Sequence, residues 1–413
     1  MRVLHLNTHP SGGSYEYAAL LSTALAERGI ESRVLCKNAA AKGGRLFLNR
    51  LIRRASVSLS REPWHGTRRL LLPPGPEELA DVDVVHLHTV ADWFDIPGWL
   101  VTLPTRVGVV ISLHDMWHFT GGCFLYRGCH LYSDTCAPCP ILKMPFNHIL
   151  AREERRRKLK AYGSRRVRFV ANSQWLADLA ERSPIVRTCG GARVISPGTD
   201  TGIFRPQNKA QCRAALAIPP DAFVIGAGAA SLTDANKNIP WLLAQLSRLP
   251  SVEHAKIALA GEGNVPIPAG LDVQLIGNLT DRRERARFFG AADIFVSASL
   301  METYGLTLVE AMACGTPTVA FRVGGIPEAV PDGKGGILCA PQDATALIEA
   351  VTALRDSEQL RKSLGNAGYQ TVLNRNALPA FAQAFIRVYE KCISPAQTPS
   401  GTRSGGLQSA VVA

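Results

Sequence analysis

The residues best suited to chemistry lie in one segment of the C-terminal half. The segment begins at Glu302, passes through a loop at Gly305 and enters a helix expected to start near Leu306. Unpaired N–H groups and the positive end of the dipole make the start of a helix a binding site for phosphate. Glu310 follows on that helix, where a carboxylate can accept hydrogen bonds from a ribose diol. The segment therefore predicts a site for the phosphates and ribose of a nucleotide.

Glycine turns and one lysine elsewhere fit the same ligand. Gly12 and Gly13 follow the first strand, Gly261 and Gly263 form a G-x-G turn, and Lys237 precedes a helix. A preorganised cation stabilises a diphosphate that departs with extra negative charge. Taken alone, each glycine pair also fits an ordinary turn, and Lys237 also fits an exposed lysine at a helix start.

One histidine is a candidate for direct contact with a reacting group. His114 ends a buried strand expected at 107–113, in the order Ser112-Leu113-His114-Asp115. A lone histidine in such a place is more often structural. Asp81-Val82-Asp83 has the letters of a metal-binding carboxylate pair, but it precedes a strand and so lies at the wrong end of the sheet for a ligand. No cofactor is therefore expected for catalysis.

A cluster of cysteines follows His114 in the chain. Four thiols with the spacing C-x5-C-x6-C-x2-C can bind zinc tetrahedrally, and this closed set leaves no open position for catalysis. Free or redox-active thiols and disulfides are the alternatives, and disulfides are the least expected in a reducing compartment. The predicted structural zinc ligands are Cys123, Cys129, Cys136 and Cys139.

Strands and helices alternate through both halves of the chain, which predicts an α/β protein with parallel sheets covered on both faces. Ligands of such sheets bind beyond the carboxyl ends of the strands, so two facing sheets place their sites across a cleft. The strands expected in the first half are 3–7, 31–36, 82–88, 107–113, 168–172 and 193–196. Those expected in the second half are 222–227, 256–260, 273–277, 294–297 and 318–321.

The length of 413 residues suits two domains. Turn residues near 197–206 separate them, and a helix followed by a tail rich in Ser, Gly and Pro ends the chain. The predicted parts are an acceptor-binding domain at 1–200 with a cysteine-rich insertion at 117–140, a nucleotide-sugar-binding domain at 201–376, a helix at 377–392 that packs back on the first domain, and a disordered tail at 393–413.

The segment from Glu302 to Glu328 resembles the E-x7-E signature of retaining glycosyltransferases of family 4, in its spacing, its EAMACGTP run and its later GGIPE. The resemblance extends over nearly the whole chain and implies the GT-B fold of two facing Rossmann-like, doubly wound domains. It implies that Glu310 holds the ribose, that Glu302 contacts the donor sugar, and that the backbone from Gly305 through Leu306 to Thr307 meets the diphosphate.

Other motifs agree with this family, with one departure. Gly12-Gly13 resembles its N-terminal glycine loop, His114 its histidine beside the donor sugar, Lys237 its phosphate lysine, and the turn from Gly261 to Gly263 a wall of its base pocket. Members usually also carry an arginine shortly before that lysine. Alanines stand here instead, at positions 229 and 230, so another group must complete the neutralisation of the diphosphate.

The charge is informative about partners. The net charge is +12, and residues 1–200 hold 27 Lys and Arg against 17 Asp and Glu. A basic face attracts nucleic acid, anionic lipid or an anionic substrate, or is simply solvated. No zinc-finger, RNA-recognition or helix-turn-helix pattern supports nucleic acid. No signal peptide and no membrane-spanning run is recognised, so a cytoplasmic protein is expected, with attachment to the inner membrane surface as a further prediction.

The predicted function is retaining, metal-independent transfer of a sugar from a nucleotide-diphosphate sugar to an acceptor. The resemblance to bacterial exopolysaccharide and colanic-acid-type enzymes, together with the basic first half, favours a lipid-linked glycan as acceptor in surface polysaccharide synthesis. The alternatives are a GT-B sugar-nucleotide epimerase, against which the E-x7-E segment argues, and a non-catalytic sugar-nucleotide binding protein, which only the missing arginine favours.

Overall fold

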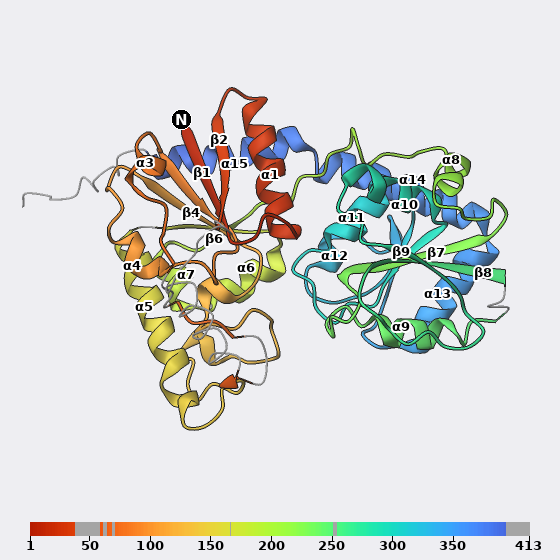
Figure 1. Ribbon diagram of the computed structural model, residues 1–413, viewed down its shortest axis with the longest axis horizontal. Coiled ribbons are helices and arrows are strands. Elements are labelled where there is room, and N and C mark those ends of the chain that lie inside the picture. The colour runs from red at the N-terminus through yellow and green to blue at the C-terminus, as the bar shows by residue number, and fades with distance from the viewer. Residues whose placement is uncertain (38–57, 61–63, 68–70, 166, 251–253, 394–413) are drawn as a thin grey trace, which may run out of the picture.

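The computed structural model describes residues 1–37, 58–60, 64–67, 71–165, 167–250 and 254–393. Two domains lie side by side, each built on a six-stranded parallel sheet with helices on both faces (Figure 1). The doubly wound α/β architecture expected from the sequence is thus confirmed. The predicted disordered tail lies almost wholly outside the described residues, as does much of the basic stretch between residues 42 and 69.

The N-terminal sheet has the strand order β2-β1-β3-β4-β5-β6. Its central strands are buried along their whole length, as expected for a sheet covered on both faces. The strands are β1 (Arg2–Asn7), β2 (Glu31–Cys36), β3 (Val84–Leu87), β4 (Gly108–Leu113), β5 (Arg168–Ala171) and β6 (Ala192–Val194). The helices are α1 (Gly13–Ala26), α3 (Pro76–Leu79), α4 (Ile96–Leu100), α5 (Leu150–Ser164), α6 (Gln174–Glu181) and α7 (Pro184–Thr188).

The C-terminal sheet has the order β12-β11-β10-β7-β8-β9. Its sixth strand, β12, is missing from the strands expected above, because four residues between a glycine turn and a proline give little periodic signal. The strands are β7 (Phe223–Ser231), β8 (Ala255–Glu262), β9 (Asp272–Gly277), β10 (Ile294–Ser297), β11 (Thr318–Phe321) and β12 (Gly336–Cys339). The helices are α8 (Lys209–Ala215), α9 (Ile239–Leu246), α10 (Arg282–Ala291), α11 (Leu306–Ala313), α12 (Ile326–Ala329), α13 (Ala344–Asp356) and α14 (Glu358–Arg375).

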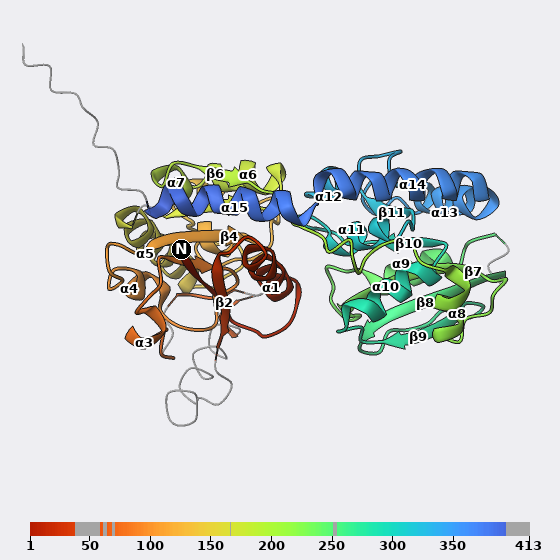
Figure 2. The same ribbon diagram turned by 90° about the horizontal axis from the view of Figure 1, so that it is seen from above.

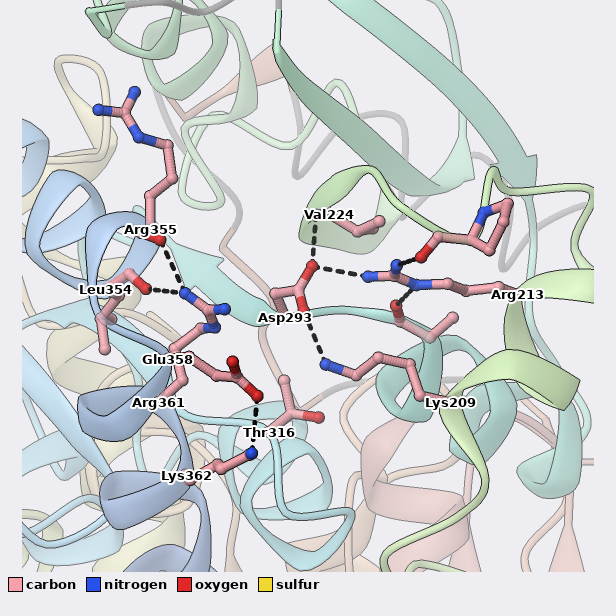
Figure 3. A network of polar contacts seen from close by, with 12 residues as sticks. Lys209, Arg213, Val224, Asp293, Thr316, Leu354, Arg355, Glu358, Arg361 and Lys362 are labelled. Carbon is pink, nitrogen blue, oxygen red and sulfur yellow. Dashed lines mark hydrogen bonds and ion pairs between the residues drawn. The ribbon is translucent and has the colours of Figure 1, made fainter.

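A buried carboxylate joins the first helix of the second domain to its sheet. Asp293 accepts hydrogen bonds from Arg213 Nη2 and from the backbone N–H of Val224, each at 2.7 Å, and pairs with Lys209 Nζ at 2.7 Å (Figure 3). Removing one partner of such a buried pair costs on the order of 3–5 kcal/mol. The network holds α8 against the ends of β7 and β10.

The last helix returns to the first domain. Helix α15 (Leu378–Ile393) runs along the N-terminal sheet, on the face away from α4 (Figure 2). Its buried Phe385 and Tyr389 pack in one cluster with residues of β1, β3 and β4. The backbone N–H of Thr199 donates to Asn376 O at 2.8 Å, so the two crossing segments are tied together. The domains are therefore connected twice.

Candidate active site

Helix α11 begins at the carboxyl edge of the C-terminal sheet with its N-terminus uncapped. Gly305 precedes it with φ +99, a left-handed conformation that favours glycine, and no side chain caps the helix. A Cβ at Gly305 would also meet Leu308 Cδ1 at 3.2 Å. The first turn therefore offers its N–H groups and positive dipole end to a ligand in front of it.

A cavity of about 660 Å³ lies in front of this helix and is lined by both domains. A second, smaller cavity adjoins it and shares Glu16, Arg282, Leu306 and Glu310 with it. The backbone at alanines 229 and 230 also lines the main cavity, so the place where relatives carry an arginine does face the site. The cavity brings together six predicted donor-binding residues: Gly12, Gly13, Gly261, Leu306, Thr307 and Glu310.

The glycine turns around this cavity are places of close backbone approach. A Cβ on Gly261 would lie 2.0 Å from Ala229 O, and this glycine has φ +141. Gly12 has φ +89 and begins α1 without a side-chain cap. A Cβ on Gly263 would meet Thr233 Cγ2 at 3.1 Å, and Gly263 does not line the cavity. The G-x-G turn thus contributes one glycine to the wall.

An arginine inside the cavity contacts acidic residues of both domains. Arg285 Nη1 donates to Glu16 Oε1 at 3.0 Å and its Nη2 contacts the other carboxylate oxygen, while Nη2 also lies 3.3 Å from Glu310 Oε1. Arg282 Nε lies 3.8 Å from Glu16. Burial raises the pKa of Glu310 to about 7; Arg285 opposes this shift and Glu16 adds to it.

The first glutamate of the signature pairs with the predicted lysine. Lys237 Nζ donates to Glu302 Oε1 at 2.5 Å, and the two side chains are 31% and 19% exposed. Asn236 Nδ2 donates to Met301 O at 2.8 Å and fixes the two loops against each other. Neither residue of the pair lines the main cavity. Both groups keep enough exposure to meet a ligand.

The segment after the signature also binds the first domain directly. Glu328 accepts hydrogen bonds from the backbone N–H groups of Gln174 at 2.6 Å and Trp175 at 2.8 Å, at the start of α6. Asn172 Nδ2 donates to Thr303 Oγ1 at 3.0 Å. A carboxylate at a helix N-terminus is favoured by the dipole. The GGIPE turn therefore helps to set how the domains face each other.

His114 follows β4 on the cleft side of the first domain and is half-buried. Its ring packs edge-on against Tyr17, with centroids 4.8 Å apart, and Tyr17 lines the smaller cavity together with Glu310. Its Nε2 lies 3.0 Å from His88 Nδ1. Burial lowers the pKa of His114 to about 4, so the ring is neutral near pH 7. His114 is thus one side chain away from the cleft cavities.

The four clustered cysteines line a separate cavity of about 340 Å³ in the N-terminal domain: Cys123, Cys129, Cys136 and Cys139. All four are free thiols. Within the described part of the chain, one group of three or more metal-ligand side chains has all its ligand atoms within 4.8 Å of one another, and it consists of His5, His86 and His88. The thiols surround a common space and would have to close around an ion, so a zinc site is still a prediction.

Sequence reasoning missed three charged residues of the cavity, namely Glu16, Arg282 and Arg285. The sequence showed that the family arginine is replaced by alanine after β7, but it did not indicate which other residue supplies the cation. The run Asp281-Arg282-Arg283-Glu284-Arg285 at a helix start was the available signal, because helix N-termini after parallel strands point at the ligand edge. Two of its arginines do line the cavity.

Comparison with known families agrees with this geometry. Residues 11–202 match the family described as Glycosyltransferase Family 4, and residues 223–357 match Glycosyl transferases group 1. The chain is 30% identical over 312 residues to D-inositol 3-phosphate glycosyltransferase 1 of Catenulispora acidiphila, covering 70% of this chain and 66% of the relative. It is 34% identical over 206 residues to D-inositol 3-phosphate glycosyltransferase of Mycobacterium marinum, covering 46% and 41%. The chain spans about half the length of most curated relatives it matches.

Solved structures share the whole architecture. Sucrose-phosphate synthase from Thermosynechococcus elongatus superposes with a TM-score of 0.67 at 18% identity, covering 94% of this chain and 98% of that one. Anabaena HepE in complex with UDP superposes with a TM-score of 0.61 at 16% identity, covering 95% and 100%. The GT-B fold implied by the sequence resemblance is thereby confirmed.

Proposed function

We propose that this chain, whose two halves carry domains of glycosyltransferase families, transfers a sugar from a nucleotide-diphosphate sugar to an acceptor held by its N-terminal domain. The observation that carries the proposal is the cavity in front of α11. It combines an uncapped helix N-terminus, a carboxylate at Glu310 and glycine turns from both domains. These are the groups that a diphosphate, a ribose and a closely approaching backbone require.

Arg285 takes over the role of the missing family arginine in this proposal. The nucleoside diphosphate gains about one negative charge as its bond to the sugar breaks, and fixed cations and dipoles stabilise that charge. Arg285 lines the cavity, Lys237 pairs with Glu302 of the signature segment, and α11 adds its dipole. Glu16 accepts a hydrogen bond from Arg285 and so positions its guanidinium. No metal is required, and Asp81 and Asp83 contact Arg2 and the N-terminus at the opposite edge of the sheet.

The transfer itself follows a front-face substitution with retention. The bond between the anomeric carbon and the phosphate oxygen breaks, the acceptor oxygen bonds to the same face, and the acceptor proton passes to the departing phosphate. No side chain has to act as a strong base. Glu302, paired with Lys237, contacts the donor sugar, and His114 orients it from the other domain. Closure of the cleft keeps water away from the donor.

The donor proposed is a UDP-sugar, because UDP is bound by Anabaena HepE, whose fold this chain shares along its length. The test is a panel of UDP-, GDP- and ADP-sugars incubated with candidate acceptors. Nucleoside diphosphate released together with a glycosylated product supports the proposal. Isomerised donor would indicate an epimerase, and donor binding without turnover would indicate a binding protein.

The acceptor proposed is a lipid-linked glycan of surface polysaccharide synthesis, met at the cytoplasmic face of the inner membrane. Three apolar side chains are exposed in the segment that follows the last of the clustered cysteines, namely Met144 at 70%, Ile149 at 66% and Phe146 at 39%. Exposed Lys143 and Arg152 flank them, and this combination suits an anionic lipid surface. No helix in the described part of the chain is long and apolar enough to span a membrane.

A second acceptor class is an inositol phosphate, because curated relatives are named D-inositol 3-phosphate glycosyltransferases. The donor panel therefore has two acceptor arms, a bacterial membrane extract and soluble inositol phosphates. Transfer only with the extract supports the lipid-linked acceptor. Transfer to an inositol phosphate in detergent-free buffer would replace it. His114→Ala is expected to lose most activity in either arm while the protein stays folded, and normal activity of this variant would remove His114 from the site.

A further inference from the structure

A hydrogen-bonded chain of histidines runs from His114 into the core of the N-terminal domain. His114 Nε2 lies 3.0 Å from His88 Nδ1, and His88 Nε2 lies 3.1 Å from His5 Nδ1. The pairing of β1 with β3 places His5 opposite His86, so His88 follows two residues further along the same face. His114 directly follows the neighbouring strand β4. Strand register thus brings the three rings into line.

Each ring in this chain is neutral at physiological pH. Burial lowers the pKa of His5 to about 3 and that of His114 to about 4. Burial, together with neighbouring histidines, also brings the pKa of His88 well below its usual range. A neutral imidazole carries one N–H, so His88 in the middle must donate at one nitrogen and accept at the other. The chain therefore has two arrangements, with all N–H groups pointing outward to the cleft or all pointing inward.

The inner end of the chain selects between these arrangements. Among the described residues, His5 Nε2 is a buried side-chain nitrogen without a hydrogen-bond partner. If the N–H groups pointed inward, this nitrogen would carry a proton with nothing to accept it. If they point outward, it is only an unused acceptor. Buried N–H groups without acceptors are rarer in proteins than acceptors that are not fully used. The outward arrangement is therefore favoured.

The neighbouring polar groups do not compete for this chain. His86 Nδ1 lies 2.8 Å from Tyr389 Oη, and its Nε2 lies 2.9 Å from Ser112 Oγ. His5, His86 and His88 come close enough to one another for a metal ion. However, both ring nitrogens of His86 and of His88 already have hydrogen-bond partners. The cluster is therefore better described as a proton-orienting chain than as a metal site.

We propose that His5 and His88 are positioning residues that hold His114 in the tautomer with its proton on Nδ1. His5 Nδ1 donates to His88 Nε2, His88 Nδ1 donates to His114 Nε2, and His114 Nδ1 keeps an N–H. Among the described residues this last nitrogen has no hydrogen-bond partner, and it is not one of the fully buried polar atoms that lack one, so it keeps some exposure through which a ligand can reach it. Under the proposed function, on which this last step rests, the ligand is an oxygen of the donor sugar.

The direct test is nitrogen-15 NMR of the protein labelled at histidine, which shows which ring nitrogen carries the proton. The His114 signals are assigned by their loss in His114→Gln. We expect Nδ1 of His114 to be protonated and Nε2 to be bare near pH 7. The reverse pattern, or a charged ring, would overturn the proposal. The measurement needs neither donor nor acceptor, so it stands apart from the proposed transferase activity.

Variants at the inner end connect the tautomer to turnover. His5→Leu removes the first donor, and we expect a mixed His114 tautomer, a fall in kcat of about threefold to tenfold from the loss of one hydrogen bond, and a nearly unchanged donor KM. His5→Gln keeps a donor toward His88 and should restore both readouts. His86→Leu, an equally buried histidine outside the chain, is the matched control and should leave the His114 tautomer unchanged. A pure outward tautomer in folded His5→Leu contradicts the proposal, and if that variant does not fold, the wild-type spectrum decides.

Discussion

Arg285 is the residue on which the donor site can be tested most sharply. Its guanidinium donates to Glu16 and contacts Glu310, and the side chain is only 13% exposed. Hydrogen bonds to charged groups are worth about 1.5–3 kcal/mol each in mutational series. If Arg285 exchanges its contact with Glu16 for one with the donor phosphates, Arg285→Met should weaken UDP binding by about 10- to 150-fold.

The assay is titration calorimetry with UDP, alone and with each acceptor. Arg283→Met is the matched control, because Arg283 lies on the same helix, carries the same charge and is exposed away from the cavity. Arg285→Lys keeps the charge but loses the fork of the guanidinium, so it should fall between wild type and Arg285→Met. If the UDP Kd of Arg285→Met is within about twofold of the wild-type value, Arg285 does not contact the diphosphate, and the role given to this arginine is refuted.

The same variant has a signature in its pH dependence. Arg285 counteracts the effect of burial on the pKa of Glu310. Without this cation the pKa of Glu310 must rise further, so the carboxylate that accepts from the ribose forms only at a higher pH. UDP binding by Arg285→Met should therefore recover in part over a more alkaline pH range, whereas binding by wild type should level off just above pH 7.

Three further outcomes are expected. In wild type, UDP affinity should rise as the pH passes through about 7 and level off above it. The free energy of unfolding should fall as the pH rises from the usual carboxyl range to about 7, because native Glu310 binds a proton more tightly than the same residue in the unfolded chain. Glu310→Gln should flatten both profiles. Glu328→Ala removes the acceptor at the start of α6 and should cost about 1–2 kcal/mol in thermal unfolding; an unchanged midpoint contradicts that contact. Purified protein should contain about one zinc per chain, lost in Cys136→Ser, and a metal content well below this ends the zinc prediction.

Apart from Gly12, Gly13 and Gly261, to which the family resemblance pointed, the part of the site that the sequence predicted lies close together in the chain. From Glu302 to Glu310 a strand end, a glycine and a helix start follow one another, so their spacing alone specifies the geometry. The same holds for the alternation of strands and helices, which indicated parallel sheets. These features depend on residues close together in the chain, and such local patterns are what sequence periodicity can predict.

The contacts that sequence missed join distant segments. Glu16 and Arg285 are 269 residues apart, and their meeting depends on how two separately folded sheets face each other. The histidine chain was missed for a similar reason, because His5 and His88 lie in apolar strands where histidine reads as a core residue. Only the register of β1 on β3 shows that their rings align.

The charged groups at the cleft assign different roles to the two domains. Arg285, Lys237 and the start of α11 supply positive charge, and all belong to the C-terminal domain. The N-terminal domain supplies His114, whose ring is neutral near pH 7 because burial lowers its pKa to about 4. Because the His114 ring is uncharged, its N–H can donate a hydrogen bond to a sugar oxygen without attracting the diphosphate away from the cations of the C-terminal domain. We therefore expect the acid limb of the rate profile to follow Glu310, whose pKa burial raises to about 7. Removing His114 should lower the rate without moving that limb.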